Sequence, residues 1–92
     1  MKISIDTNKL FENVKKECEK DFASLDRCFE NHYLMACMTK RQLVQQSMDR
    51  SFGIIMFVAN QIVGYDDSAD LLDWWENDMF HRYWDKKREV GE

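Results

Sequence analysis

The chain contains no proline and only three glycines among its 92 residues. Most tight turns use one of these residues, because proline fixes φ and glycine reaches backbone conformations that other residues avoid. A chain with so few of them can build only a few turns. The composition therefore predicts one domain, residues 1–92, that is almost entirely helical.

Long apolar runs are also missing. No stretch approaches the roughly 18 apolar residues that a membrane span needs, and the N-terminal MKISIDTNK is too polar for a signal peptide. Three cysteines, an odd number, do not make a disulfide framework, so free thiols in a reducing cytoplasm are the simpler interpretation. The net charge is −4, whereas nucleic-acid binding normally needs a basic surface. We therefore expect neither membrane binding nor direct nucleic-acid binding.

Motifs of common catalytic sites are absent as well. The sequence has no glycine-rich phosphate loop, no G-x-S-x-G and no H-E-x-x-H. Cys28 and His32 are four residues apart, a spacing that can hold a metal on one helix turn, so a thiol- or metal-dependent sensor is one alternative. There is no C-x-x-C and no second closely spaced pair of ligands, and His32 falls on an apolar stripe. We expect a core histidine there, and no enzyme activity, metal or cofactor.

The segment Thr39–Val63 is the predicted central helix. Thr39 and Gln42 have the spacing of a capping box. Apolar residues then recur at steps of three and four, the period of one helix face. Gly64 follows where a left-handed residue commonly ends a helix. The stretch 53–59 is apolar on nearly all sides, which is typical of a helix buried between neighbours or in contact with another chain.

Two further helices are expected, at about residues 7–37 and 67–88. Asp6 is the expected N-cap of the first, with Ile5 and Leu10 at the spacing of a hydrophobic staple. Its apolar stripe persists throughout, although a break at Asn31–His32 remains open. Short connections favour antiparallel neighbours, so the prediction is an all-α, antiparallel three-helix bundle with a long first helix. The stripe consists of Leu10, Phe11, Val14, Cys18, Phe22, Leu25, Phe29, His32, Tyr33 and Ala36.

The last predicted helix has more aromatic residues than one core-facing stripe needs. Trp84 follows Trp75 by nine residues, which at about 100° per residue places it about 180° away. Phe80 lies near Trp84, and Trp74 lies at the flank. The side that would dock on the other two helices carries Leu71, Leu72, Trp75, Met79 and Tyr83.

Carboxylates and other polar residues accompany these aromatics on the outer side of the same helix. Tryptophan is enriched at the centres of protein interfaces, and carboxylates around it would attract a basic partner. The alternative is that the small bundle wraps its third helix on both sides, or that the first helix kinks over Trp84. The predicted partner-binding residues are Trp74, Phe80, Trp84, Asp70, Asp73, Asn77 and His81.

A secondary contact surface is predicted at Met56 and Phe57, which fall outside the apolar face of the central helix. Leu34, Met35 and Met38 either join that surface or close the end of the bundle. Methionine suits adaptable contact surfaces of this kind. Self-association through this surface, as a homodimer or larger assembly, is the alternative to a foreign partner.

These patterns predict a non-enzymatic protein-binding module. One version is a small acidic inhibitor that covers a basic, nucleic-acid-binding surface of a larger machine. Small anti-defence proteins of phages and mobile elements often act in this way, which is an analogy of size and charge only. The second hypothesis is a self-associating helical assembly protein with no foreign target.

Overall fold

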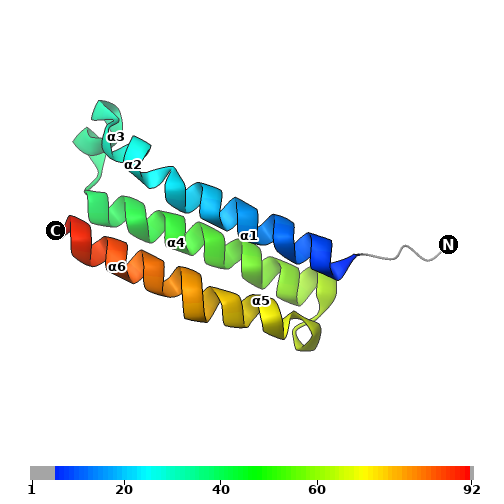
Figure 1. Cartoon of the computed structure of the whole chain (residues 1–92). Helices are drawn as coiled ribbons and strands as arrows, with labels where there is room; N and C mark the ends of the chain where they lie inside the picture. Colours follow the sequence, from blue (N-terminus) through cyan, green and yellow to red (C-terminus); the bar gives the residue numbers. More distant parts are fainter. Residues whose placement is uncertain (1–5, 92) are drawn as a thin grey trace.

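The computed structural model describes residues 6–91 and shows a chain that is almost entirely helical (Figure 1). The prediction of an all-α protein is confirmed, because these residues contain no strand. Ile5 of the predicted hydrophobic staple lies outside the described residues. The α-helices are α1 (Thr7–Ala23), α2 (Leu25–Phe29), α3 (His32–Cys37), α4 (Lys40–Phe57), α5 (Ala69–Trp74) and α6 (Phe80–Val90).

Three shorter segments connect or extend these helices. The π-helical segment η1 (Val58–Val63) continues α4, the 3-10 turn η2 (Asp66–Ser68) leads into α5, and the π-helical segment η3 (Trp75–Met79) joins α5 to α6. We call α5, η3 and α6 together the last rod. Figure 1 shows α1, α4 and the last rod side by side, with α2 and α3 at the end where α4 begins. Within residues 6–91, no helix has both the length and the apolar character required to cross a bilayer.

The first helix is shorter than predicted, because residues 7–37 form three helical segments instead of one. Ser24 follows α1, and its hydroxyl donates to the carbonyl of Asp21 at 2.6 Å, a local bond that competes with regular helix geometry. Asn31 begins α3, where its side chain accepts from the backbone N–H of Tyr33 at 3.0 Å. His32 and Tyr33, placed on the apolar stripe by the sequence, are therefore exposed.

Short motifs correctly indicated where helices begin and end. Asp6 caps α1 by accepting from the backbone N–H of Lys9 at 3.2 Å. Thr39 and Gln42 form both hydrogen bonds of the capping box, at 3.1 and 2.8 Å. Gly64 follows η1 with φ of 105°, a backbone conformation that glycine adopts without the steric cost of a Cβ.

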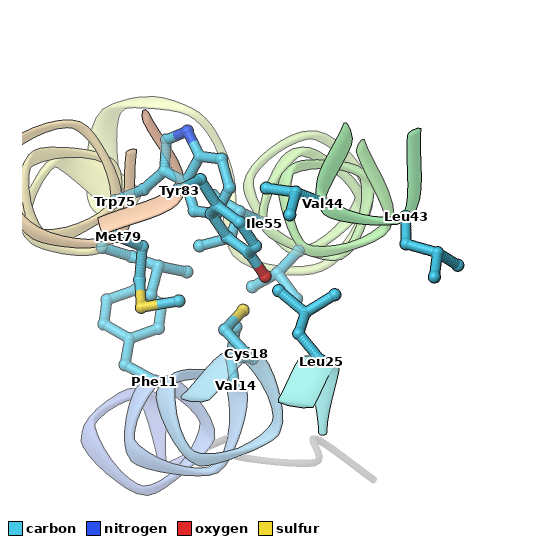
Figure 2. Packing of buried hydrophobic residues seen from close by; sticks show 12 residues of the cluster. Phe11, Val14, Cys18, Leu25, Leu43, Val44, Ile55, Trp75, Met79 and Tyr83 are labelled. Atoms are coloured by element: carbon cyan, nitrogen blue, oxygen red, sulfur yellow. The ribbon is translucent and has the colours of Figure 1, made fainter. Parts of the chain in front are cut away.

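The interior lies between α1, α4 and the last rod, and Figure 2 shows side chains from all three converging on it. Tyr83 of α6 connects them. Its ring meets that of Phe22 of α1 edge to face at 5.0 Å, and its hydroxyl is 2.9 Å from those of Ser47 and Ser51 of α4. Burial raises the pKa of the Tyr83 phenol, so this group stays protonated at neutral pH. The other core residues include Phe11, Val14, Cys18, Leu25, Val44, Ile55, Leu71, Trp75 and Met79.

The last rod points residues into this interior at regular steps of four. In a regular α-helix such a stripe drifts by about 40° at each step, because four residues turn about 400°. A π turn contains more residues than an α turn, so η3 cancels part of that drift. This local geometry decides which side chains fall on the two flanks of the rod. The inward residues are Leu71, Trp75, Met79, Tyr83 and Lys87.

Gly53 lies on the exposed side of α4, and no atom would approach within 4 Å of a Cβ placed there. Glycine costs about 1 kcal/mol relative to alanine inside a helix. We therefore expect Gly53→Ala to raise the free energy of unfolding by about 0.5–1 kcal/mol in a urea titration. A decrease would contradict the open space around Gly53.

Candidate protein-interaction site

Phe80 and Trp84 lie next to each other on the surface of α6. Their side chains are 37% and 40% exposed, and their ring centroids are 6.1 Å apart in an edge-to-face arrangement. The ammonium group of Lys87 lies 4.6 Å from the centroid of the Trp84 ring, within the range of a cation–π interaction. These two residues, here called the aromatic pair, present large apolar area to solvent.

Trp74 does not belong to this pair. It is half-buried and packs against the core, and the ammonium group of Lys15 of α1 lies 5.6 Å from its ring centroid. Trp74 therefore faces α1, whereas Phe80 lines a hollow together with Phe52 of α4. The two residues occupy opposite flanks of the last rod, so the structure separates what the sequence had grouped.

Trp84 is also placed differently from the predicted position opposite Trp75. Lys87, which stacks on Trp84, donates a hydrogen bond to the side-chain oxygen of Gln45 on α4. Trp84 therefore lies at the flank of the rod that faces α4. The π segment η3 explains the difference, because each of its residues advances by less than the 100° assumed for an α-helix.

The predicted polar residues Asp70, Asp73, Asn77 and His81 are all exposed. None of their side chains forms a hydrogen bond or ion pair with another residue in the range 6–91. They follow one another along the solvent side of the last rod, between the flank that faces α1 and the flank that faces α4. These groups are therefore available to another molecule.

Charge is distributed unevenly around this surface, because residues 51–81 contain neither lysine nor arginine. Six carboxylates fall in the same stretch, and Asp78 forms an ion pair with Arg82 at 2.7 Å. The other five are exposed and form no ion pair with any residue that the structure describes. We call these five residues the acidic edge: Asp66, Asp67, Asp70, Asp73 and Glu76.

A hollow of about 380 Å³, here called the aromatic groove, lies between α4 and the last rod. Trp75, only 5% exposed, forms its floor, and its ring centroid is 5.6 Å from that of Phe52. Phe52 and Tyr65 on its walls are 44% and 58% exposed. No residue of α1 takes part. The lining consists of Phe52, Met56, Tyr65, Leu72, Trp75, Glu76 and Phe80.

Sequence reasoning missed most of this groove. It included Phe52 in no predicted contact surface, and it placed Leu72 only on the side that docks on the other two helices. The available signal was a repeat of four on both walls: Phe52 and Met56 on one, and Leu72, Glu76 and Phe80 on the other. Only the pairing of the two helices shows that these rows face the same space.

The predicted secondary surface is divided. Met56 is half-buried and lines the aromatic groove, whereas Phe57 is 58% exposed and does not line it. Ile54 of the same helix is 42% exposed, so α4 does present apolar residues outside the groove. The remaining candidates, two at the end of the first predicted helix and one just after it, pack against the core and are half-buried: Leu34, Met35 and Met38.

Cys28 and His32 no longer share one helix, because Asn31 begins a new helix between them. His32 is exposed, which corrects the expectation of a core histidine. Among residues 6–91, no three His, Cys, Asp or Glu side chains are grouped in a way that could hold a metal ion. The thiol of Cys18 is buried, and burial raises its pKa, so it stays in the unreactive protonated form.

Comparisons of this chain with protein-family models, with curated proteins and with solved structures find no match. The chemistry and shape of the surface are therefore the evidence for what the molecule does.

Proposed function

We propose that this chain is a non-enzymatic protein-binding module, built as an antiparallel three-helix bundle, whose partner has a basic surface. The observation that carries the proposal is the exposed aromatic pair on the same rod as three of the five carboxylates of the acidic edge, with the other two in the turn before it. Both lie within residues 51–85, a stretch of sequence whose only lysine or arginine is Arg82, which is already paired with Asp78. The nearest cation to the pair is Lys87, whose ammonium group is held between the Trp84 ring and Gln45.

The two kinds of side chain serve different parts of binding. Tryptophan and other large aromatics supply most of the free energy at many interfaces, because they bury much apolar area at once. Unpaired carboxylates add little affinity at the rim, but they speed the capture of a positively charged partner and reject a negatively charged one. An aromatic pair beside an acidic edge therefore favours a basic partner over an acidic one.

One version of this function is an inhibitor that covers a nucleic-acid-binding surface of a larger machine. Such a surface is rich in lysine and arginine because it must neutralise phosphates. The acidic edge carries charge of the same sign as a phosphate backbone and would be drawn to the same place. In this version the module acts by occupying the surface, and Phe80 and Trp84 hold it there.

The test is affinity capture from extracts of the native host with the wild-type chain and with Trp84→Ala. The captured protein is identified by mass spectrometry, purified, and titrated by calorimetry. We expect Trp84→Ala to raise its Kd by about 30-fold, which corresponds to the roughly 2 kcal/mol of an interface hot spot, while circular dichroism stays unchanged. Tyr33→Ala, which removes an 86% exposed aromatic on α3, is the matched control and should bind normally. An unchanged Kd for Trp84→Ala would contradict the proposal.

A second candidate function is self-assembly, which the exposed apolar residues of α4 favour. Phe57 and Ile54 lie outside the aromatic groove and are 58% and 42% exposed. Sedimentation over a wide concentration range separates the two functions. A monomer at all concentrations supports a foreign partner. A tight dimer that Phe57→Ser dissociates supports self-assembly.

A further inference from the structure

The pair formed by α4 and the last rod has two faces. Helix α1 covers one of them, and the aromatic groove lies on the other. On the first face, α1 lies against both α4 and the last rod and inserts Phe11, Val14 and Cys18 between them. Figure 2 shows α1 on one side of the core and the indole of Trp75 between α4 and the last rod on the other. Within residues 6–91 no segment covers this second face, since only α4, the connecting turn and the last rod line the hollow.

The walls of the aromatic groove follow the axes of two helices. Phe52 and Met56 are one turn apart on α4, and Leu72 and Phe80 are two steps of four apart on the last rod. A groove between two parallel rows of this kind accepts the side-chain ridge of another helix. Helices that bind in this way use apolar residues at steps of three and four. The shape therefore suits a helix better than an extended strand, which would seek backbone groups at a sheet edge.

The charges around the groove define the polar side of that helix. Glu76 is the one charged residue in the lining, and the rest of the acidic edge lies on the same rod and the turn before it. A helix with lysine or arginine beside its apolar stripe would place cations opposite these carboxylates. A second copy of this chain suits the site less well, because it would bring its own net charge of −4.

We infer that the aromatic groove receives an amphipathic helix of another protein, with lysine and arginine flanking its apolar stripe, and that the complex is a four-helix bundle. This inference rests on the proposed function, because it names the segment of the partner that is bound. Trp75 supplies the floor under the inserted apolar side chains, while Phe52, Met56 and Phe80 enclose them.

The test uses the full-length chain labelled with ¹⁵N and two synthetic helical probes of equal length. The first probe carries leucine at steps of three and four with lysine on both flanks, and the second carries glutamate in place of lysine. We expect the lysine probe to shift the amide signals of residues 52–56, 65 and 72–80, and to bind at least about tenfold more tightly than the glutamate probe at low salt. Absence of binding by the lysine probe, equal binding by both probes, or shifts centred on α1 or α3 would overturn the inference.

Substitutions in the groove separate this inference from the proposed function. Phe52→Ala and Met56→Ala remove wall side chains that are exposed or half-buried, and each should weaken the lysine probe by about tenfold, a typical loss for an interface contact of more than 1 kcal/mol. Tyr33→Ala, at an exposed aromatic of α3 outside the groove, is the matched control. If Trp84→Ala releases the natural partner while Phe52→Ala and Met56→Ala retain it, the groove inference is wrong and the proposed function stands. If the probe binds as expected but Trp84→Ala leaves the natural partner bound, the proposed function is wrong and the groove inference stands. A dimer with groove signals broadened by self-association would also overturn the inference.

Discussion

Replacing Tyr83 by alanine is expected to lower the free energy of unfolding by about 3–5 kcal/mol, the usual cost of removing a large aromatic side chain from a core. Tyr83 has no measurable exposure. It contacts Phe22 of α1 and both Ser47 and Ser51 of α4, as well as Trp75 of its own rod. Domains of this size are stable by only about 5–15 kcal/mol. The variant should therefore lose a large share of its stability in a urea titration.

Tyr83→Phe keeps the ring and removes only the hydroxyl, so it gives a result even if the alanine variant does not fold. Its expected cost is about 1–3 kcal/mol, because the hydroxyls of Ser47 and Ser51 lose a buried partner. Both serines lie on a helix and can turn toward backbone carbonyls, which favours the lower end of that range. Tyr33→Phe and Tyr33→Ala, at an 86% exposed position, should change stability by less than about 0.5 kcal/mol. Equal effects at Tyr83 and Tyr33 would contradict the packing of the last rod.

Local signals located several helix ends but not every break, and they did not locate the contacts between helices. The absence of proline, the N-caps at Asp6 and Thr39, and Gly64 after η1 each act within a few residues, so they can be recognised without knowing the fold. The break at Ser24 was missed because a serine hydroxyl bonds equally well inside or at the end of a helix. His32 was misplaced for a related reason, since Asn31 starts a new helix and rotates the following residues away from the stripe.

The candidate site depends on the angular positions of the side chains around the axis of the last rod. The sequence defines these angles less well than it defines helix ends. A uniform 100° per residue grouped Trp74 with Phe80 and Trp84 and placed Trp84 opposite Trp75. The π segment η3 changes this rotation, so that Trp74 faces α1 and Phe80 faces α4. A hint was present in the repeat of four at Leu71, Trp75, Met79 and Tyr83, because a regular helix would let such a stripe drift. The aromatic groove needs more, since its two walls come from helices that only tertiary packing brings together.

Neutralising part of the acidic edge is expected to slow association with a basic partner by about tenfold to hundredfold at low salt, within the range that electrostatic steering produces. The variant carries Asp70→Asn, Asp73→Asn and Glu76→Gln, three exposed carboxylates with no ion pair among residues 6–91. Stopped-flow or surface-based kinetics with the captured partner would measure the association rate across a salt series. At about 1 M salt, where screening acts over about 3 Å, the rates of variant and wild type should converge.

A matched variant decides whether the association rate depends on where the carboxylates lie or only on the net charge of the chain. Glu12→Gln, Glu17→Gln and Glu30→Gln remove the same number of negative charges from exposed residues that lie before α4 and form no ion pair in the described part of the chain. Steering depends on the local field that the partner meets, so this variant should associate at nearly the wild-type rate. Equal slowing by both triple variants would mean that net charge alone attracts the partner. The acidic edge would then have no special role in binding. A change confined to the dissociation rate of the acidic-edge variant would instead place these carboxylates in direct, desolvated contact with the partner's cations.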